Sequence, residues 1–380
     1  MDARDRDGWP VSRSPPAVAN AVADTAYARF RSGRYFGSLD GLRAISVLAV
    51  MWHHTVGHDQ TLPQLFRNGD EGVTLFFAIS GFLITTLLLR ERDTAGVINL
   101  RAFYIRRALR IFPLYYAVVA VYVVLTLLFE RTSPAGREFF ANLIFFLTYT
   151  SNWYVALEGR VIFYFAWSLA AEEQFYLLWP SVQRFFTPMR AVALMLTVIV
   201  LVAGLQWWGP PGGQRPAPLW YRAVTGIPLA ICFGVVLAHL LHWRRSFVAL
   251  RWLFASRLGS LFFLGVLIAS LSWRGGPLQL IHLAAALLIG ACVYREDHWL
   301  AGLLKWRVLA HLGAVSYGMY LMHLLVKNVV GRALSLLHVT PWPYLMFVLT
   351  VIGTVVVATL SFRYFESIFL RKKSQFSART

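Results

Sequence analysis

Cysteine is nearly absent from this chain of 380 residues. There are two cysteines, Cys232 and Cys292, and both lie inside apolar stretches. This excludes a disulfide framework and a Cys-x-x-Cys metal or redox motif. We therefore expect no redox chemistry, no bound metal and no permanently bound cofactor.

Charged residues are also scarce. They make up 14% of the chain and hydrophobic residues 58%, whereas a soluble domain usually has about 25% and about 45–50%. The 36 Lys and Arg against 18 Asp and Glu give a net charge of +18, which in a soluble protein would indicate nucleic-acid binding. With a mean hydropathy of +0.57, the excess instead fits the short cytoplasmic loops of a multi-pass membrane protein. We expect membrane lipid, and no nucleic acid, as a partner.

Apolar stretches of about 20 residues, the length that crosses a bilayer, recur along the chain. They lie near 42–57, 72–89, 111–129, 191–207, 223–242, 258–272, 277–294, 309–330 and 344–365.

The interval 139–180 is apolar but interrupted by polar residues, so it holds either one span with a re-entrant piece or two spans. The connections rich in Lys and Arg all fall on the cytoplasmic side only if this interval crosses once. The sequence thus predicts an all-α polytopic protein of the cell membrane, with about ten transmembrane helices and both termini cytoplasmic. We expect a disordered tail over 1–35, a transmembrane domain over 36–370 and a basic tail over 371–380.

Two ionisable residues share one face of the first expected span. Arg43 and His54 are eleven residues apart, which on a helix is three turns plus roughly 20°, or about 16 Å along the axis. Arg43 falls at the cytoplasmic end and His54 deep in the membrane or toward its outer side. An interfacial anchor and a helix-packing hydrogen bond are the structural alternatives, but ionisable residues within spans are usually functional.

Arginines cluster at the cytoplasmic end of the third span, in FYIRRALRIFPLYY at 103–116. Arg106 and Arg110 share a helix face, and Arg107 lies beside them. This suits a diffuse anionic ligand such as a phosphorylated cofactor. The positive-inside rule alone explains the cluster equally well.

Glu172 and Glu173 are adjacent in the aromatic segment WSLAAEEQFYLLWP at 167–180. A pair of carboxylates is costly to leave in lipid, so at least one should face a wet cavity or a cation. Structural pairing with an arginine is the alternative. The same segment and SYGMYLMH at 316–323 supply further candidates, for which aromatic packing is the alternative: Trp167, Ser168, Tyr176, Tyr320 and His323.

The series of segments resembles the acyltransferase 3 family of integral membrane O-acyltransferases. The match is ordered over about residues 36–370: LDGLRAISVLAVMWHH, GVTLFFAISGFLIT, FYIRRALRIFPLYY, WSLAAEEQFYLLWP and LGAVSYGMYLMH. Five elements in the expected order are far more specific than any one of them. The sequence departs from the family at one point: Glu366 is followed by Ser367, where the family tends to have proline. The contribution of the C-terminal segment of this chain to the resemblance is therefore weaker.

The resemblance implies transfer of an acyl group, often acetyl, from acyl-CoA to a hydroxyl of a carbohydrate, a surface or exported polysaccharide, or a glycosylated natural product. Arg43 and His54 match the family's Arg-x10-His element, and Glu172 and Glu173 match the carboxylates that follow its WSL signature.

A sugar hydroxyl is a weak nucleophile, so we assign His54 as the general base. Arg106, Arg107 and Arg110 are assigned to the phosphates of acyl-CoA. Glu172 would orient His54 or hold an arginine. Direct transfer and an acyl group resting on His54 both stay open. The alternative function is a non-enzymatic carrier or flippase for a lipid-linked glycan, which would pass a polar head group along the same buried charges.

Overall fold

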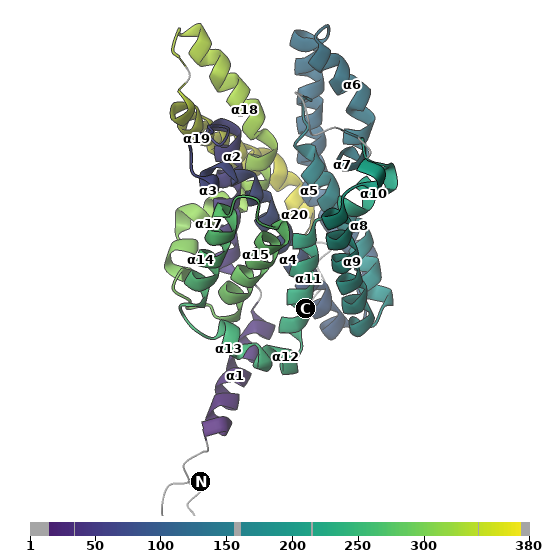
Figure 1. The fold of residues 1–380 in the computed structure, drawn as a ribbon, viewed down its shortest axis with the longest axis vertical. Coiled ribbons are helices and arrows are strands. Elements are labelled where there is room, and N and C mark those ends of the chain that lie inside the picture. Colours follow the sequence, from purple (N-terminus) through teal and green to yellow (C-terminus); the bar gives the residue numbers. More distant parts are fainter. Residues whose placement is uncertain (1–14, 34, 156–160, 214–215, 341, 374–380) are drawn as a thin grey trace, which may run out of the picture.

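The computed structural model describes residues 15–33, 35–155, 161–213, 216–340 and 342–373, and within them every regular element is a helix (Figure 1). The longer helices are α1 (Pro15–Ser32), α2 (Gly37–Thr55), α4 (Gly72–Ala95), α5 (Leu100–Leu125), α6 (Pro134–Leu147), α8 (Ala166–Phe185), α9 (Pro188–Trp208), α11 (Leu229–His242), α14 (Gly259–Ser272), α15 (Leu278–Tyr294), α18 (Ser316–Leu336) and α19 (Pro343–Ser361). The shorter helices are α3 (Gln64–Arg67), η1 (Gly69–Glu71), η2 (Thr126–Glu130), α7 (Ser151–Tyr154), η3 (Pro211–Gly213), α10 (Leu219–Thr225), α12 (Arg244–Ala249), α13 (Arg251–Phe254), α16 (Ala301–Leu304), α17 (Arg307–Ala314), η4 (Phe362–Glu366) and α20 (Ser367–Lys373).

Several helix boundaries follow local sequence signals. The side chain of Asn99 accepts a hydrogen bond from the amide of Ala102 (3.0 Å) at the start of α5. Thr187 caps α9 in the same way, with Pro188 at the first helical position. Both side chains satisfy an amide that has no partner within the helix. α4 ends before Gly96, whose left-handed backbone (φ +72°) terminates the helix.

Helix α4 lies at the centre of the molecule, where it packs against α2, α8, α11 and α15. Its closest approach is to α11. A Cβ atom added at Gly81 would lie 2.1 Å from the carbonyl oxygen of Ile231, and one added at Gly234 would lie 2.2 Å from that of Ala78. Small residues therefore allow the two backbones to touch, as is common between membrane helices.

The protein is a multi-pass membrane protein. Among the described residues, four helical stretches are long and apolar enough to cross a membrane: Gly69–Ala95, Leu100–Glu130, Pro188–Trp208 and Pro343–Lys372. The count rises to six if α10 with α11 and α17 with α18, which are bent by 40° and 76°, each form one span. Ten spans and two cytoplasmic termini stay predictions.

Other expected spans are short, polar or divided. α14 has 14 residues, which is about 21 Å and less than the roughly 30 Å of a hydrocarbon core. α2 has 19 residues but carries Asp40, Arg43, His53 and His54. The interval 139–180 contains most of α6, all of α7 and most of α8, with residues between α7 and α8 outside the described part.

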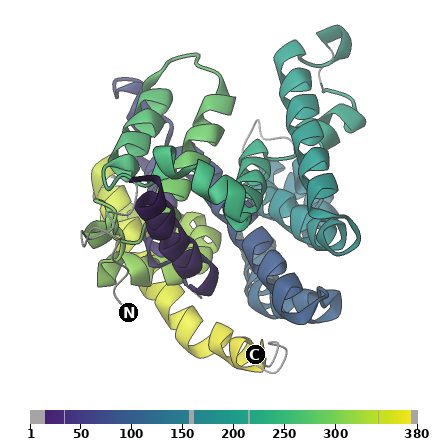
Figure 2. The ribbon, with the colours of Figure 1, turned by 90° about the horizontal axis from the view of Figure 1, so that it is seen from below.

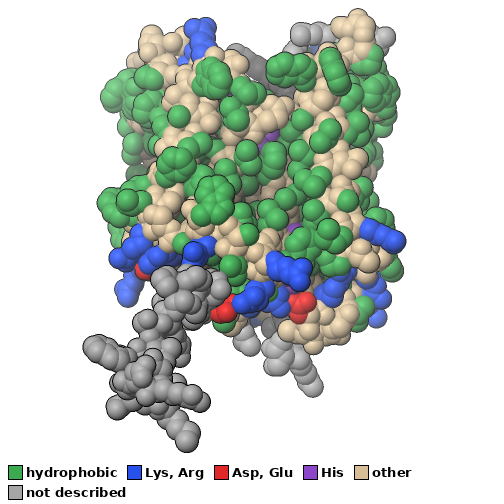
Figure 3. Space-filling view, turned by 60° about the horizontal axis from the view of Figure 1, so that its bottom comes forward, with side chains coloured by type: hydrophobic (Ala, Val, Ile, Leu, Met, Phe, Trp, Pro, Cys, Tyr) green, Lys and Arg blue, Asp and Glu red, His purple; other side chains and the backbone are tan. Residues whose placement is uncertain are grey.

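Hydrophobic side chains form a broad belt around the visible face of the molecule (Figure 3). Lys and Arg, with a few Asp and Glu, gather below this belt at one end of the molecule. In the ribbon view this end holds α12 and α13 (Figure 1). We refer to it as the basic end.

The N-terminal segment differs from the prediction of a disordered tail over 1–35. It contains α1, which lies against α12 and α15 at the basic end (Figure 2). Phe30 is buried, and the hydroxyl of Tyr27 donates to the carbonyl of His242 (2.7 Å). Aromatic anchors therefore hold this helix on the domain. Residues 1–14 and 34 of that tail lie outside the described residues, as do residues 374–380 of the predicted tail over 371–380.

Candidate active site

A cavity of about 430 Å³ lies among α2, α4, α5, α8 and α18. These helices come from distant parts of the chain, yet they bring most of the expected site residues together. The predicted residues that line the cavity are Arg43, Arg107, Arg110, Ser168, Glu172, Glu173, Tyr176 and Tyr320. Apolar side chains such as Phe76, Phe77, Leu83 and Ile84 form the rest of its wall.

Three arginines bring positive charge into the cavity. Arg107 and Arg110 are one turn apart in α5, Arg43 comes from α2, and the charges of Arg43 and Arg107 both act on Arg110. Arg43 donates to Asp40 (3.2 Å). Within the described part of the chain, the guanidinium of Arg110 has no hydrogen-bond partner, although Glu366 lies within electrostatic range. The Arg107 guanidinium likewise makes no hydrogen bond among the described residues, since Glu172 is 3.8 Å away, so Arg107 and Arg110 both keep donors for a ligand.

Glu172 is held by three groups in the cavity. It accepts hydrogen bonds from the hydroxyls of Ser80 and Tyr176, and its carboxylate lies 3.8 Å from the guanidinium of Arg107. It makes no hydrogen bond or ion pair with His54 among the described residues. Of the two roles expected for Glu172, the geometry favours holding an arginine over orienting the histidine.

Arg107 is fixed by stacking as well as by charge. Its guanidinium lies over the ring of Tyr176, 3.5 Å from the centroid, where the ring quadrupole attracts a cation. Glu173 adds a second carboxylate within electrostatic range of Arg107. The Nε of Arg107 is buried without a partner among the described residues. These contacts aim the planar group at the cavity.

Tyr35 marks the edge of the cavity, just before α2. Its hydroxyl donates to Asp40, and this hydrogen bond raises the pKa of Tyr35 to about 12. Tyr35 is therefore neutral at pH 7. The other oxygen of Asp40 accepts from Arg43, so a tyrosine and a carboxylate position the arginine at the cavity edge.

His54 lies outside the cavity lining, in the last turn of α2 and about 16 Å along the axis from Arg43. Its Nδ1 is 3.2 Å from the hydroxyl of Tyr164. The ammonium of Lys327 donates to its backbone carbonyl, and its ring stacks on His323 with 5.1 Å between centroids. The sequence was right to place Arg43 and His54 on one helix, but they belong to two separate environments.

Tyr320 and His323 form the layer between these environments. Tyr320 lines the cavity, and its hydroxyl hydrogen-bonds with Ser168 (2.6 Å). Its backbone carbonyl accepts from Nδ1 of His323 (2.6 Å), so Nδ1 carries the hydrogen and Nε2 holds a lone pair. That Nε2 is buried, with no partner within the described residues. One layer of side chains thus separates the cavity from His54.

Besides His54 and His323, two further predicted residues, Arg106 and Trp167, do not line the cavity. The guanidinium of Arg106 pairs with the carboxylate of Glu91 near the end of α4 (3.3 Å) and is not part of the cavity lining. Trp167 packs edge-on against Phe77, with 6.1 Å between ring centroids, and so lies behind the cavity wall.

Other residues of the site were missed in the sequence. Ser80 and Tyr317 line the cavity, and Tyr164 and Lys327 contact His54. A lysine within an expected span, here 309–330, was a usable signal for Lys327. Ser80 and the two tyrosines carried none, because their positions depend on which helices are neighbours.

The model of the acyltransferase domain of the acyltransferase 3 family matches residues 36–363. The chain belongs to the acyltransferase 3 family. The matched region contains His54 and every residue of the cavity lining except Tyr35. The resemblance seen in the ordered segments is therefore confirmed.

Three curated relatives share the family's region with this chain. The peptidoglycan O-acetyltransferase OatA of Listeria monocytogenes is 29% identical over 367 residues, covering 88% of this chain and 56% of OatA. YrhL of Bacillus subtilis, provisionally named a peptidoglycan O-acetyltransferase, is 32% identical over 375 residues, covering 90% and 56%. A protein of Staphylococcus aureus, provisionally named an O-acetyltransferase, is 28% identical over 379 residues, covering 91% and 59%. The chain thus spans little more than half the length of these relatives. No solved structure matches it significantly.

Proposed function

We propose that this protein is a membrane O-acyltransferase that takes an acyl group, expected to be acetyl, from acyl-CoA and transfers it to a carbohydrate hydroxyl. Membership of the acyltransferase 3 family and the names of the relatives support transfer to oxygen. The donor and the acceptor are argued from the cavity and from the surroundings of His54.

The observation that carries the donor assignment is Arg110, which lines the cavity without a hydrogen-bond partner among the described residues. Coenzyme A carries a 3′-phosphate and a pyrophosphate, and a guanidinium binds such oxygens bidentately. Arg43 and Arg107 are oriented by their own partners and add charge beside it. The apolar wall around Phe76 and Leu83 suits the uncharged arm that links the nucleotide to the thioester.

His54 is proposed as the general base. Its imidazole takes the proton of the acceptor hydroxyl while that oxygen attacks the carbonyl carbon of the thioester. The C–O bond forms, the C–S bond breaks, and the departing thiolate recovers the proton from the imidazolium. Such proton transfer contributes roughly 10²–10⁴-fold to a rate.

The distance of about 16 Å along α2 between Arg43 and His54 allows two routes. In the first, the arm of the donor extends past Tyr320 and the hydroxyl attacks the thioester directly. In the second, the acyl group first forms a bond with His54 as thiolate leaves, and the hydroxyl then displaces the imidazole. Only the second leaves labelled acyl group on the chain when acceptor is withheld, and His54→Ala removes that label.

The acceptor is proposed as a hydroxyl of an exported or surface glycan, or of a glycosylated natural product. Two of the relatives carry peptidoglycan in their names, which supports a glycan at the outer face. His54 lies at the end of α2 opposite Arg43, so an acceptor on that side would meet the histidine first.

The test is transfer from labelled acetyl-CoA in isolated membranes, measured as label in glycan and natural-product fractions. Arg110→Gln should raise the KM for acetyl-CoA about tenfold or more, since a hydrogen bond to a charged group is worth about 1.5–3 kcal/mol. Arg106→Gln is the matched control, because Arg106 lies on the same helix but pairs with Glu91 away from the cavity.

Equal KM values for the two variants would contradict the donor site. Absence of any acylated product, with no dependence on acetyl-CoA, would replace the acyltransferase with a carrier or flippase for a lipid-linked glycan.

A further inference from the structure

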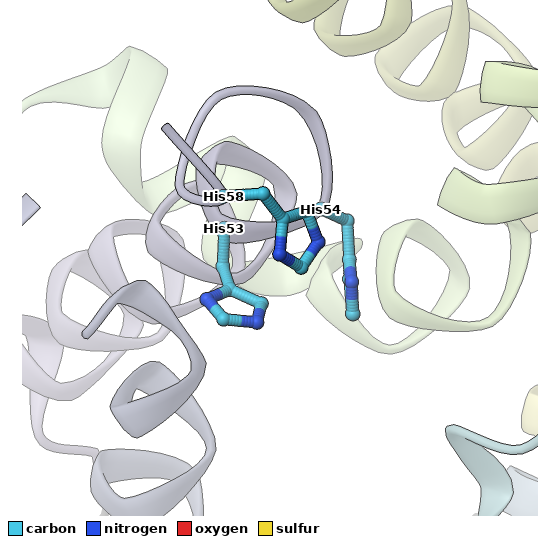
Figure 4. A group of neighbouring side chains, drawn as sticks. All are labelled: His53, His54 and His58. Carbon is cyan, nitrogen blue, oxygen red and sulfur yellow. The ribbon is translucent and has the colours of Figure 1, made fainter. Parts of the chain in front are cut away.

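Three histidines converge at the end of α2 opposite the cavity, namely His53, His54 and His58 (Figure 4). Each offers one ring nitrogen, and these three atoms all lie within 4.8 Å of one another. The ring of His53 is 5.2 Å from that of His54 and 5.0 Å from that of His58, centroid to centroid. Modest side-chain rotation would bring the nitrogens to the spacing of ligands around one ion.

A glycine turn brings His58 back to the helix. The amide of Gly57 donates to the carbonyl of Trp52 (3.0 Å), which closes the turn directly after α2. A Cβ atom at position 57 would lie 2.7 Å from the Cα of His53. Only glycine allows this close return, which places His58 beside His53 without a regular helix.

The hydrogen bond of the His53 ring leaves its other nitrogen available to a metal ion. Its Nδ1 is 3.1 Å from the carbonyl of Arg67, which can only accept, so Nδ1 carries the hydrogen and Nε2 presents a lone pair. Metal-binding histidines typically donate their second nitrogen to a carbonyl or carboxylate. The carboxylate of Asp70 lies 3.6 Å from the same Nδ1. Gly69 keeps this segment close, since a Cβ there would lie 2.4 Å from the carbonyl of Ala49.

We propose that His53, His54 and His58 form a binding site for a divalent transition metal such as Zn²⁺. Imidazole nitrogens suit zinc, copper and nickel, and three histidines leave a fourth position for water or a substrate oxygen. Asp70 supplies negative charge beside the site, while the ammonium of Lys327 is directed at the backbone carbonyl of His54. The site replaces the expectation that the protein binds no metal, which rested on cysteine motifs.

Binding would have a consequence for catalysis, and this consequence rests on the proposed function. A neutral imidazole has one lone pair. His54 therefore cannot ligate a metal and accept the proton of a hydroxyl at the same time. Metal occupancy should inhibit acyl transfer reversibly, and a chelator should restore it.

The test uses the full-length protein, purified in detergent without a polyhistidine tag. Titration with Zn²⁺, followed by calorimetry, should show one ion per chain, and Co²⁺ should give the visible absorption of a four-coordinate site. His58→Ala and His53→Ala should each weaken binding at least tenfold. His58 is partly exposed to solvent in a turn, so its replacement does not threaten folding. His338→Ala removes an exposed histidine elsewhere and should leave the affinity unchanged.

Unchanged Zn²⁺ affinity in both His53→Ala and His58→Ala would overturn the site, as would loss of binding in His338→Ala. For inhibition, each protein is compared with its own metal-free rate. Zn²⁺ that binds at the three histidines but leaves acetyl transfer unaffected would overturn the inhibitory role. Absence of transfer in every sample would count against the proposed function, while the binding measurement would still decide the site.

Discussion

At the scale of single residues, the position of His54 is fixed by contacts from two other parts of the chain. Tyr164 hydrogen-bonds with its ring, His323 stacks on the ring, and Lys327 donates to its backbone carbonyl. These contacts hold both the ring plane and the backbone of His54, as the proposed role of general base requires.

Replacing His54 by alanine should abolish acyl transfer while the protein still inserts and accumulates. The expected loss is about 10²–10⁴-fold, the usual contribution of a general base. Initial rates with labelled acetyl-CoA, divided by the amount of protein in the membrane, measure it. His338→Ala serves as the control, since His338 is exposed and distant in sequence from the site. Turnover within a few fold of the unmodified protein would rule out His54 as the base.

Four of the predicted residues that line the cavity are of a kind that is costly to place in a membrane. Arg107, Arg110, Glu172 and Glu173 each stand out in an apolar segment, and the structure brings all of them to one cavity. Their partners could not be read in the same way. Ser80 is an ordinary residue in its own segment and gains its role only because α4 packs against α8.

At the scale of helices, the apolar stretches indicate where α2 and α5 lie but do not say which face of each helix meets which neighbour. Arg106 and Arg110 were expected to act together because they share a face of α5. The structure separates them, because Glu91 lies close enough to pair with Arg106 while Arg110 lines the cavity. The spacing of residues within one helix does not predict an ion pair with a carboxylate from another helix.

The contact between α4 and α11 should be sensitive to added volume. In Gly81→Ala the new Cβ would meet the backbone carbonyl of Ile231 at 2.1 Å, and backbone cannot move aside as a side chain does. Overpacking of this kind typically costs about 1–3 kcal/mol, so the unfolding temperature in detergent should fall. Gly265→Ala in α14 is the matched control, because a Cβ there has nothing within 4 Å and alanine favours a helix.

Thermal unfolding followed by circular dichroism compares the two glycine variants. An unfolding temperature for Gly81→Ala equal to that of Gly265→Ala would show that the two helices can move apart at little cost. The Gly81→Ala substitution should also disturb the cavity, since Ser80, the preceding residue of α4, hydrogen-bonds to Glu172.

At the scale of the whole molecule, charge and hydrophobicity divide along one axis. On the visible face, Lys and Arg gather mainly at the basic end, below a hydrophobic belt (Figure 3). Arg43 lies toward the basic end of α2, and His54 with its neighbouring histidines lies at the other end. The positive-inside rule predicts that the basic end faces the cytoplasm, the side on which the proposed donor, acyl-CoA, would be available.

This orientation can be tested with single cysteines and a membrane-impermeant maleimide. The two native cysteines are buried, with 2% and 3% of their surface exposed, so background labelling should be low. Thr61→Cys lies in the exposed loop that follows the three histidines, and Ser256→Cys lies in an exposed loop at the basic end. In intact cells, Thr61→Cys should react and Ser256→Cys should react only after the membrane is opened. The reverse pattern would put the arginine-lined cavity on the outer side and so remove its access to cytoplasmic acyl-CoA. Labelling of both cysteines in intact cells would mean that the chain between them does not cross the membrane as the charge distribution predicts.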